Sequence, residues 1–495
     1  MKQGPLLTAL LLLWIGYVFN SCAKEYSCEN CKEANKPPVG NDPGQPNQPP
    51  VARAGADIIY KLPTTSVNVN GSQSYDPDGT IVSYSWKQID GANQTNIVSP
   101  QNVASEVNTL TGGLYTLELT VADNKGLTSK DTVRIIEDQM CGSNRPQINA
   151  ELIKIGELSE GREGIIAATA LNKILFVGGI GKKDHLFISK NIDIYNYSSN
   201  SWSLAELSIT RINMGIAVSG NKIFIAGGEA YGQYFSRIDI YDALTNTWSI
   251  AELSEARSNV AAVAFGDKIY FAGGNHLEGN NMVYSNKVDI YNTTTGTWTS
   301  SYISQARSTM VGTTLNNQVY FAGGITTDNV ISDQIDIYNA TTQTWSTSHL
   351  AEPKYFFAGL AIKGNIYWAG GYTGTNYNTE EISRMVEIKN AATQSAIITC
   401  LSTNRAAASA VLNKDDIIFY DSYPLSPWIL WNWYSNTFDI YNTATGTWSV
   451  GEFRFVPCFQ PAIIAAGGQV YVAGGTNKLS GILADVLKDV YLLKY

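Results

Sequence analysis

Residues 251–274 read AELSEARSNVAAVAFGDKIYFAGG and residues 287–300 read KVDIYNTTTGTWTS, and this pattern decides the fold. The same pattern recurs along the chain with a period of roughly fifty residues. Asp421-Ser422 stands where one of its glycine doublets is missing. The doublets that are present are Gly178-Gly179, Gly227-Gly228, Gly273-Gly274, Gly323-Gly324, Gly370-Gly371 and Gly474-Gly475. A repeated unit of this length predicts a repeat protein.

Two spacings inside the unit are nearly constant. A basic residue precedes the first doublet position by sixteen residues in six units, at Arg162, Arg211, Arg257, Arg307, Lys354 and Arg405. A tyrosine precedes a tryptophan by seven residues in five units, at Tyr195/Trp202, Tyr241/Trp248, Tyr291/Trp298, Tyr338/Trp345 and Tyr441/Trp448. This regularity predicts that all units share one structure.

Within the quoted unit we expect four strands, named a to d. Their predicted ranges are Ser258–Phe265, Lys268–Ala272, Lys287–Tyr291 and Thr297–Ser301. Strands a and b are almost continuously apolar, which is typical of strands covered on both faces. Four short strands per unit predict a β-propeller, in which each unit is one blade. The order of glycine doublet, Asp-Ile-Tyr-Asn and Thr-x-Thr-Trp resembles the kelch repeat over residues 151–495.

The strand count predicts how the ring closes. The chain holds seven sets of strands a, b and c, and the last set ends at Tyr495 without a strand d. Leu152–Ser159 matches Trp202–Ser208, with Ile153 in the tryptophan position. We therefore predict an all-β, seven-bladed kelch-type propeller in which the N-terminal strand completes the last blade. This closure leaves no free sheet edge at the join.

Residues 1–21 have the features of an export signal. The apolar run Leu6–Phe19 is too short for a settled transmembrane helix. Phe19-Asn20-Ser21-Cys22 resembles a bacterial lipobox, although Phe and Asn replace the usual residues. The resemblance implies a lipoprotein of the bacterial outer membrane, acylated at Cys22, on the periplasmic or cell-surface side. Lys24-Glu25 resembles the surface-export signals of Bacteroidetes lipoproteins. The alternative is an ordinary secretory signal with an incidental cysteine.

Two further segments should lack a core of their own. Residues 22–50 are predicted to form a disordered tether, because Asn35–Pro50 consists mostly of Pro, Asn, Gly and Gln. Cys28 and Cys31 lie in this segment without the surroundings of a redox or zinc site, so we expect a local disulfide or free thiols. Residues 139–150 form a short linker. The blade positions of Cys400 and Cys458 argue against a bond between them, and we expect the fold not to depend on disulfides.

Residues 51–138 form a separate domain. Gly71–Gly79, Ile81–Trp86 and Tyr115–Gly126 resemble the PKD domain, an immunoglobulin-like β-sandwich. Alternation agrees with this, because it places Val82, Tyr84 and Trp86 on one face of a strand. The resemblance implies a spacer or adhesive module. Asp76 and Asp78 lie in a turn sequence, and calcium is the cation that they would bind if they form a site.

Composition limits the partners. The net charge is −9 and the pI is near 5.0, which argues against nucleic acid and against an anionic membrane surface. Membrane contact is therefore expected only through the lipid anchor. His185, His276 and His349 fall in different units, and no Cys, His and carboxylate group has metal-ligand spacing. We expect no metal or other cofactor in the propeller.

Candidate binding residues should lie on the face shared by the b–c and d–a loops. Arginines at the repeated basic position bind acidic ligands in some kelch proteins, which makes Arg162, Arg211, Arg257, Arg307 and Arg405 candidates. The alternative is a structural role, with bonds to loop carbonyls and to Glu157, Glu206 and Glu252. Their repetition favours this alternative. The variable b–c loops carry aromatic candidates: Tyr231, Tyr234, Phe235, Tyr372, Tyr377, Trp428, Trp431, Trp433 and Tyr434. The three tryptophans either form a stacking platform or pack between blades.

Two functions follow from these features. We predict an envelope-anchored binding protein that presents one propeller face to a glycan or protein ligand. The alternative is a sugar-active enzyme resembling the kelch-type sialic-acid epimerase (mutarotase), which would need an acid/base pair and an arginine for the substrate carboxylate. Convergence of Arg, Glu and His in an axial pocket would favour the enzyme, and a broad aromatic rim would favour the binding protein.

Overall fold

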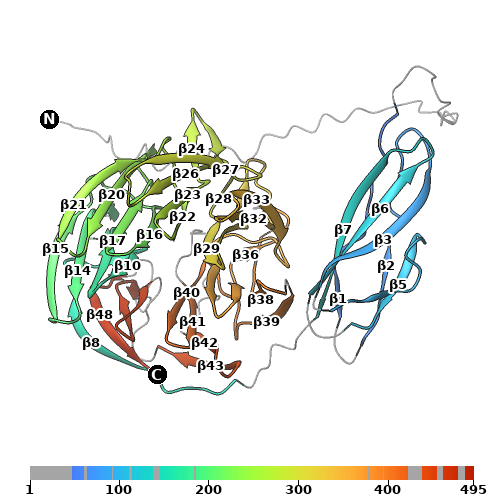
Figure 1. The fold of residues 1–495 in the computed structure, drawn as a ribbon. Helices are drawn as coiled ribbons and strands as arrows, with labels where there is room; N and C mark the ends of the chain where they lie inside the picture. The colour runs from blue at the N-terminus through green and yellow to red at the C-terminus, as the bar shows by residue number, and fades with distance from the viewer. Residues whose placement is uncertain are drawn as a thin grey trace, which may run out of the picture.

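The computed structural model describes residues 47–60, 64–91, 93–110, 114–137, 145–182, 186–376, 380–393, 395–421, 437–453, 461–477 and 485–495. The expected signal peptide, Cys22, Cys28 and Cys31 lie outside these ranges. Regular structure in the described residues is all β. No helix among them is long and apolar enough to span a bilayer. Figure 1 shows two β units, a narrow sandwich and a larger ring of sheets.

The N-terminal unit consists of two small sheets around one core. One sheet has the order β1 (Ile58–Tyr60), β7 (Thr128–Glu137), β6 (Leu114–Asp123) and β3 (Ile81–Gly91), and the other has β2 (Val67–Asn70), β5 (Ala104–Asn108) and β4 (Asn96–Ile97). Trp86 and Leu119 are buried in the core, as the predicted sandwich requires. Val82 is instead 63% exposed, because the pairing of β3 with β6 shifts register between Ile81 and Ser83.

The larger unit contains seven four-stranded antiparallel sheets, which we number as blades one to seven. Blades one to three are β10 (Ile166–Ala170), β11 (Lys173–Val177), β14 (Asn191–Asn196), β15 (Ser201–Glu206); β16 (Gly215–Ser219), β17 (Lys222–Ala226), β20 (Arg237–Asp242), β21 (Thr247–Glu252); and β22 (Ala261–Phe265), β23 (Lys268–Ala272), β26 (Lys287–Asn292), β27 (Trp298–Tyr302). Blades four to six are β29 (Val311–Leu315), β30 (Gln318–Ala322), β32 (Gln334–Asn339), β33 (Thr344–His349); β34 (Ala358–Ile362), β35 (Asn365–Ala369), β38 (Met385–Asn390), β39 (Ala396–Cys400); and β40 (Ala408–Asn413), β41 (Asp416–Asp421), β42 (Thr437–Asn442), β43 (Thr447–Glu452). Blade seven is β44 (Ala462–Ala466), β45 (Gln469–Ala473), β48 (Asp489–Lys494) and β8 (Glu151–Glu157).

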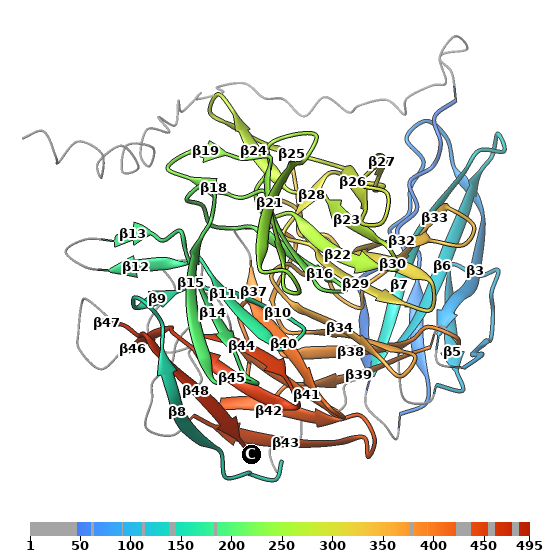
Figure 2. The same ribbon diagram turned by 60° about the vertical axis from the view of Figure 1, so that its left-hand side comes forward.

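The blades form a closed ring. Strand a of each blade contacts strand a of the next, in the order β10, β16, β22, β29, β34, β40 and β44, and β44 contacts β10. Figure 2 shows the sheets following one another around this ring. In blade three, strand b matches its predicted range, whereas strand a begins at Ala261 and not at Ser258. The three residues before Ala261 belong instead to the loop that approaches the axis.

The predicted mixed closure is confirmed. β8 pairs with β48 and supplies strand d of blade seven, and Leu158 just after it is 3% exposed. The predicted register is wrong by one residue at the start of this strand. Leu152 pairs with Leu493, and an irregularity between Val490 and Tyr491 shifts Ile153 away from the tryptophan position. The bulge adds one residue to this strand, so Leu152–Ser159 is one residue longer than Trp202–Ser208, but the sequence did not show where the extra residue lies.

The b–c loops form short hairpins on one face of the ring. They include β12 (Ile180–Lys182) with β13 (Leu186–Ile188), β18 (Glu229–Ala230) with β19 (Gln233–Tyr234), β24 (Asn275–Glu278) with β25 (Asn281–Tyr284), β36 (Tyr372–Thr373) with β37 (Glu381–Ile382), and β46 (Thr476–Asn477) with β47 (Asp485–Val486). The d–a loops pair with them, as in the bridges Ile212 to Glu229 and Tyr355 to Tyr372. Both loop sets therefore build one face, as expected.

Cys400, at the end of β39, is disulfide-bonded. The other cysteines of the chain, Cys141 and Cys458 among them, lie outside the described residues. The expectation that the fold does not depend on disulfides stays a prediction.

Candidate functional site

The repeated arginines lie inside the blades. The Arg257 Nη1 donates to the carbonyl oxygens of Gly273 at 2.6 Å and Lys287 at 3.0 Å, and Nη2 pairs with the Asp289 carboxylate at 2.5 Å. Burial lowers the pKa of Arg257, and the charge of Asp289 opposes this shift. The same kinds of partner surround Arg162, Arg211 and Arg307. All four guanidinium groups are fully buried.

This burial corrects the expectation that the arginines ring the ligand face. A guanidinium without exposed surface, already bonded to carbonyls and a carboxylate, is not available to a ligand. The positions agree with the structural alternative, but the carboxylates differ from those expected. Asp193, Asp239, Asp289 and Asp336 on strand c bind the arginines. Glu157 and Glu206 pair instead with exposed lysines.

Blade six keeps this arrangement without its glycine doublet. Arg405 Nη2 lies 2.7 Å from Asp439 Oδ2, and its Nη1 lies 3.2 Å from Asp421 Oδ2. Asp421 occupies the position of the glycine whose carbonyl oxygen binds the arginine in other blades. Its carboxylate therefore replaces that carbonyl as an acceptor. Burial raises the pKa of Asp421 to about 6, although Arg405 opposes the shift.

The residue two positions after each basic residue has a left-handed backbone. The φ angles are 61° for Gly164, 57° for Asn213, 52° for Asn259, 56° for Thr309, 46° for Phe356 and 46° for Ala407. Gly and Asn adopt this conformation readily, whereas Thr309, Phe356 and Ala407 are strained there. The backbone N–H of Asn259 donates to the backbone carbonyl oxygen of Asn213 at 2.9 Å, which links neighbouring blades. We call these six residues the rim.

The rim surrounds the mouth of an axial channel of about 540 Å³, lined by residues from all seven blades. Below the rim the lining is mostly apolar and includes Ile165, Met214, Val260, Met310, Phe357 and Ala408. Its polar side chains include Asn213, Asn259, Thr309, Ser409 and Tyr420. None of the described lining residues carries a charged side chain. A charged ligand group would lose hydration there without a counter-charge, so the channel favours a neutral ligand.

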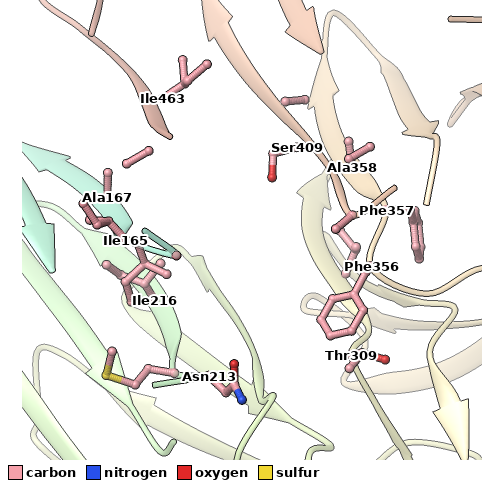
Figure 3. A pocket seen from close by; sticks show the side chains of 18 of the residues that line it. Ile165, Ala167, Asn213, Ile216, Thr309, Phe356, Phe357, Ala358, Ser409 and Ile463 are labelled. Atoms are coloured by element: carbon pink, nitrogen blue, oxygen red, sulfur yellow. The ribbon is translucent and has the colours of Figure 1, made fainter. Parts of the chain in front are cut away.

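The rim has a polar half and an apolar half. In the polar half, Asn213 Nδ2 donates to Glu229 Oε1 at 2.8 Å, and Asn259 Nδ2 donates to Asn275 Oδ1 at 3.1 Å. These bonds hold the amides in place. In the apolar half, Phe356 packs on a cluster that includes Ile325, Ile331, Tyr355 and Tyr372. Figure 3 shows the Phe356 ring and the Asn213 side chain directed toward the open middle of the channel.

The aromatic candidates from the sequence lie in different environments. Tyr231 is 79% exposed in the β18–β19 hairpin. Tyr234 is partly buried, and burial together with Glu229 raises its pKa to about 12. Tyr372 is buried and stacks on Tyr355 with ring centroids 5.1 Å apart, so its ring is not accessible to a ligand. Tyr377, Trp428, Trp431, Trp433 and Tyr434 lie outside the described residues.

Sequence reasoning missed the rim, including Phe356, Asn213 and Asn259. A signal was present, because the rim position reads Gly, Asn, Asn, Thr, Phe and Ala in successive units. Phe356 is the bulky exception in that series. Only the backbone geometry shows that this position is left-handed and faces the channel.

The described residues do not bring together the groups that an acid/base enzyme would need. None of the described lining residues of the channel is Arg, Glu or His. His276 and His349 lie in separate blades, and His185 is outside the described residues. Within the described part of the chain, no three His, Cys, Asp or Glu residues are placed to hold a metal ion. Lys125 Nζ lies 3.2 Å from Asp78 Oδ2, and calcium binding at Asp76 and Asp78 stays a prediction.

The seven sheets around an axial channel define a β-propeller with a loop-lined mouth, joined to a β-sandwich. Comparison with protein-family models agrees with this division. Residues 164–371 and 213–421 match the KLHDC2/KLHL20/DRC7 Kelch-repeats domain, and residues 54–136 match a PKD domain. Because the Kelch matches together span just over half of the chain, the chain belongs to the kelch-repeat proteins.

Curated relatives share a short stretch. The human low-density lipoprotein receptor-related protein 11 is 37% identical over 87 residues, which are 18% of this chain and 17% of the relative. The mouse dyslexia-associated protein KIAA0319-like protein is 40% identical over 93 residues, 18% of this chain and 8% of the relative. The human dyslexia-associated protein KIAA0319 is 33% identical over 121 residues, 24% and 11% of the two chains. This chain thus spans less than a fifth of each of these relatives.

Proposed function

We propose that this chain is a non-enzymatic binding protein that holds an uncharged glycan at the rim of the axial channel. The observation that carries the proposal is Phe356. It keeps an aromatic ring in a strained backbone conformation, at a position where other blades have Gly, Asn, Thr or Ala. Strain of this kind persists at ligand sites more often than elsewhere.

The chemistry of the rim suits a neutral sugar. A sugar ring has an apolar face that packs on an aromatic ring, and hydroxyl groups at its edge that bond to amides. Phe356 offers the ring, and Asn213 and Asn259 offer amides in the other half of the rim. An acidic sugar fits poorly, because the nearby arginines are bonded inside the blades. For the same reason the geometry does not favour the sialic-acid epimerase alternative.

The test is a screen of the full chain against neutral and sialylated oligosaccharides, followed by calorimetry with the best neutral binder. Phe356→Asn introduces the residue that blades two and three already have at the rim. We expect it to weaken binding by about 1–3 kcal/mol, roughly 5- to 150-fold, while the protein stays folded. Tyr302→Asn is the control, because Tyr302 is an exposed aromatic residue on β27, away from the channel.

The outcomes separate the alternatives. Binding of sialylated but not neutral glycans would contradict the proposal and favour the sialic-acid epimerase alternative. Failure to bind any glycan, combined with saturable binding of a protein partner that Phe356→Asn abolishes, would keep the rim as the site and replace the ligand class.

We also propose that the binding protein is held at the bacterial outer membrane by a lipid on Cys22. The support comes from the sequence, in which an apolar export signal, a cysteine and a polar tether follow one another. A diacyl group and an N-acyl chain on the same cysteine together anchor a protein firmly. In this arrangement the tether holds the two folded domains away from the bilayer.

A further inference from the structure

Blade five departs from the repeat on its outer side. Five other blades pair a tyrosine on strand c with a tryptophan on strand d, whereas blade five pairs Lys389 with Ala396. Lys389 is only 6% exposed and Ala396 only 3%. Strand d is mostly exposed in blades one, two and four, but in β39 every second residue is buried. Burial alone does not distinguish Lys389, because Tyr195, Tyr241 and Tyr338 at the same position of other blades are 5%, 2% and 9% exposed. The charge at this position and the buried residues of the edge strand β39 indicate that another element reaches this side of blade five.

The PKD domain provides that cover. Its strand β6 contacts β39, and Figure 2 shows the sandwich against this side of the ring. Lys389 Nζ lies 3.6 Å from Asp90 Oδ2 of the PKD domain and donates to Ser348 Oγ at 2.8 Å. The lysine thus has one partner on each side of the contact.

Arg134 on β7 makes a second contact between the domains. Its Nε binds Asp57 Oδ2 at 2.9 Å within the PKD domain. Its Nη1 reaches the propeller, where it binds Asp333 Oδ2 at 3.2 Å and the Leu350 carbonyl oxygen. The Arg134 side chain is only 15% exposed. A largely buried guanidinium shared by acceptors of both domains contributes more than an exposed ion pair.

The linker that follows is also attached. Arg145 Nη1 binds Asp439 Oδ1 at 2.6 Å, and the guanidinium lies 4.1 Å from the centre of the Trp448 ring. Ile148 N donates to the Val450 carbonyl at 2.9 Å, so the linker is joined to β43 by an isolated parallel bridge between Gln147 and Val450. Burial lowers the pKa of Arg145, and Asp439 opposes this shift. The chain is therefore fixed to the propeller on both sides of residues 138–144.

We propose that the PKD domain and the propeller form one rigid body, and that blade five lost its tyrosine–tryptophan pair because this surface is the docking site for the PKD domain. The sandwich is then not a freely swinging spacer. It sets a constant orientation of the rim relative to the tether. This inference does not depend on the nature of the ligand.

The test places a specific protease site within residues 138–144 of the full chain and cleaves it. After cleavage and reduction of disulfides, we expect the two halves of the wild type to co-elute in size-exclusion chromatography. Arg134→Glu should abolish co-elution, because it places a carboxylate against Asp57 and Asp333. Lys130→Glu is the matched control on the same strand, since Lys130 is exposed and pairs only within its own domain.

Lys389→Glu tests the contact from the propeller side and should also separate the halves. It keeps the test valid if Arg134→Glu unfolds the PKD domain, which circular dichroism of the separated half would show. Separation of the wild-type halves at micromolar concentration would overturn the proposal. So would co-elution of the Arg134→Glu and Lys389→Glu halves.

Discussion

At the residue scale, the repeated arginine is a structural residue of five blades, one to four and six. Its guanidinium joins strands b and c through carbonyl oxygens and an aspartate. This explains why the spacing of sixteen residues hardly varies while the loops around it do. A buried ion pair is weak evidence of net stabilisation, but removing one partner leaves an uncompensated charge.

Arg257→Ala should therefore destabilise the propeller by about 3–5 kcal/mol. The Asp289 carboxylate and two carbonyl oxygens would lose their donor inside the blade. Lys190→Ala, which breaks the exposed pair with Glu206, should cost less than about 1 kcal/mol. Urea unfolding followed by tryptophan fluorescence measures both. Equal midpoints for the two variants would show that the buried pair has no structural role.

The raised pKa of Asp421 predicts that the stability of the protein depends on pH through this residue of blade six. Its folded pKa of about 6 lies above its ordinary value of 3.8, so the folded state binds the proton more tightly than the unfolded state. This contribution to stability is complete below about pH 4 and is lost as the pH rises through 6. We expect Asp421→Asn to flatten the fall of the melting temperature between about pH 4.5 and about pH 7. Asp415→Asn, an exposed carboxylate, should leave the profile unchanged.

At the element scale, β8 is the strand on which closure depends. It pairs along β48, and Leu152 and Ile155 pack against the cores on the two sides of blade seven. Each such apolar side chain contributes roughly 1.5–3 kcal/mol when it is fully buried. The linker segment before β8 adds Ile148 and Ala150 to one of these cores.

A chain that begins at Arg145 should fold and melt cooperatively, whereas one that begins at Gly161 should not. The longer deletion removes β8 together with its backbone pairs and apolar side chains. Melting curves of the two truncated chains decide the matter. If both melt at the same temperature, the N-terminal strand does not close the ring.

At the scale of the whole molecule, the proposed anchor, tether, docked PKD domain and propeller form a linear series. Cys22→Ala should release the protein from membranes, because the acyl chains would be lost. The measurement is partition between the detergent and aqueous phases of Triton X-114, with Cys28→Ala as the control. An aqueous wild type would contradict lipidation.

The sequence by itself determined the repeat, the seven blades and the N-terminal closing strand. Residues such as Arg257, Tyr291 and Trp298 recur at the same place in five of the seven units. The last unit ends at Tyr495 without a strand d, and Leu152–Ser159 is the one segment that matches the missing strand. The PKD sandwich was predictable for the same reason, since its strands alternate around Trp86. These features follow from local patterns along the chain.

Only the tertiary structure decided which of the repeated residues face the axial channel. Arg257 and Phe356 both belong to d–a loops, but the guanidinium turns into its blade and the ring turns to the axis. The bulge in β8 and the docking of the PKD domain on Lys389 were equally hidden. These features depend on backbone direction and on contacts between segments far apart in the chain. Such contacts do not produce a periodic pattern in the sequence.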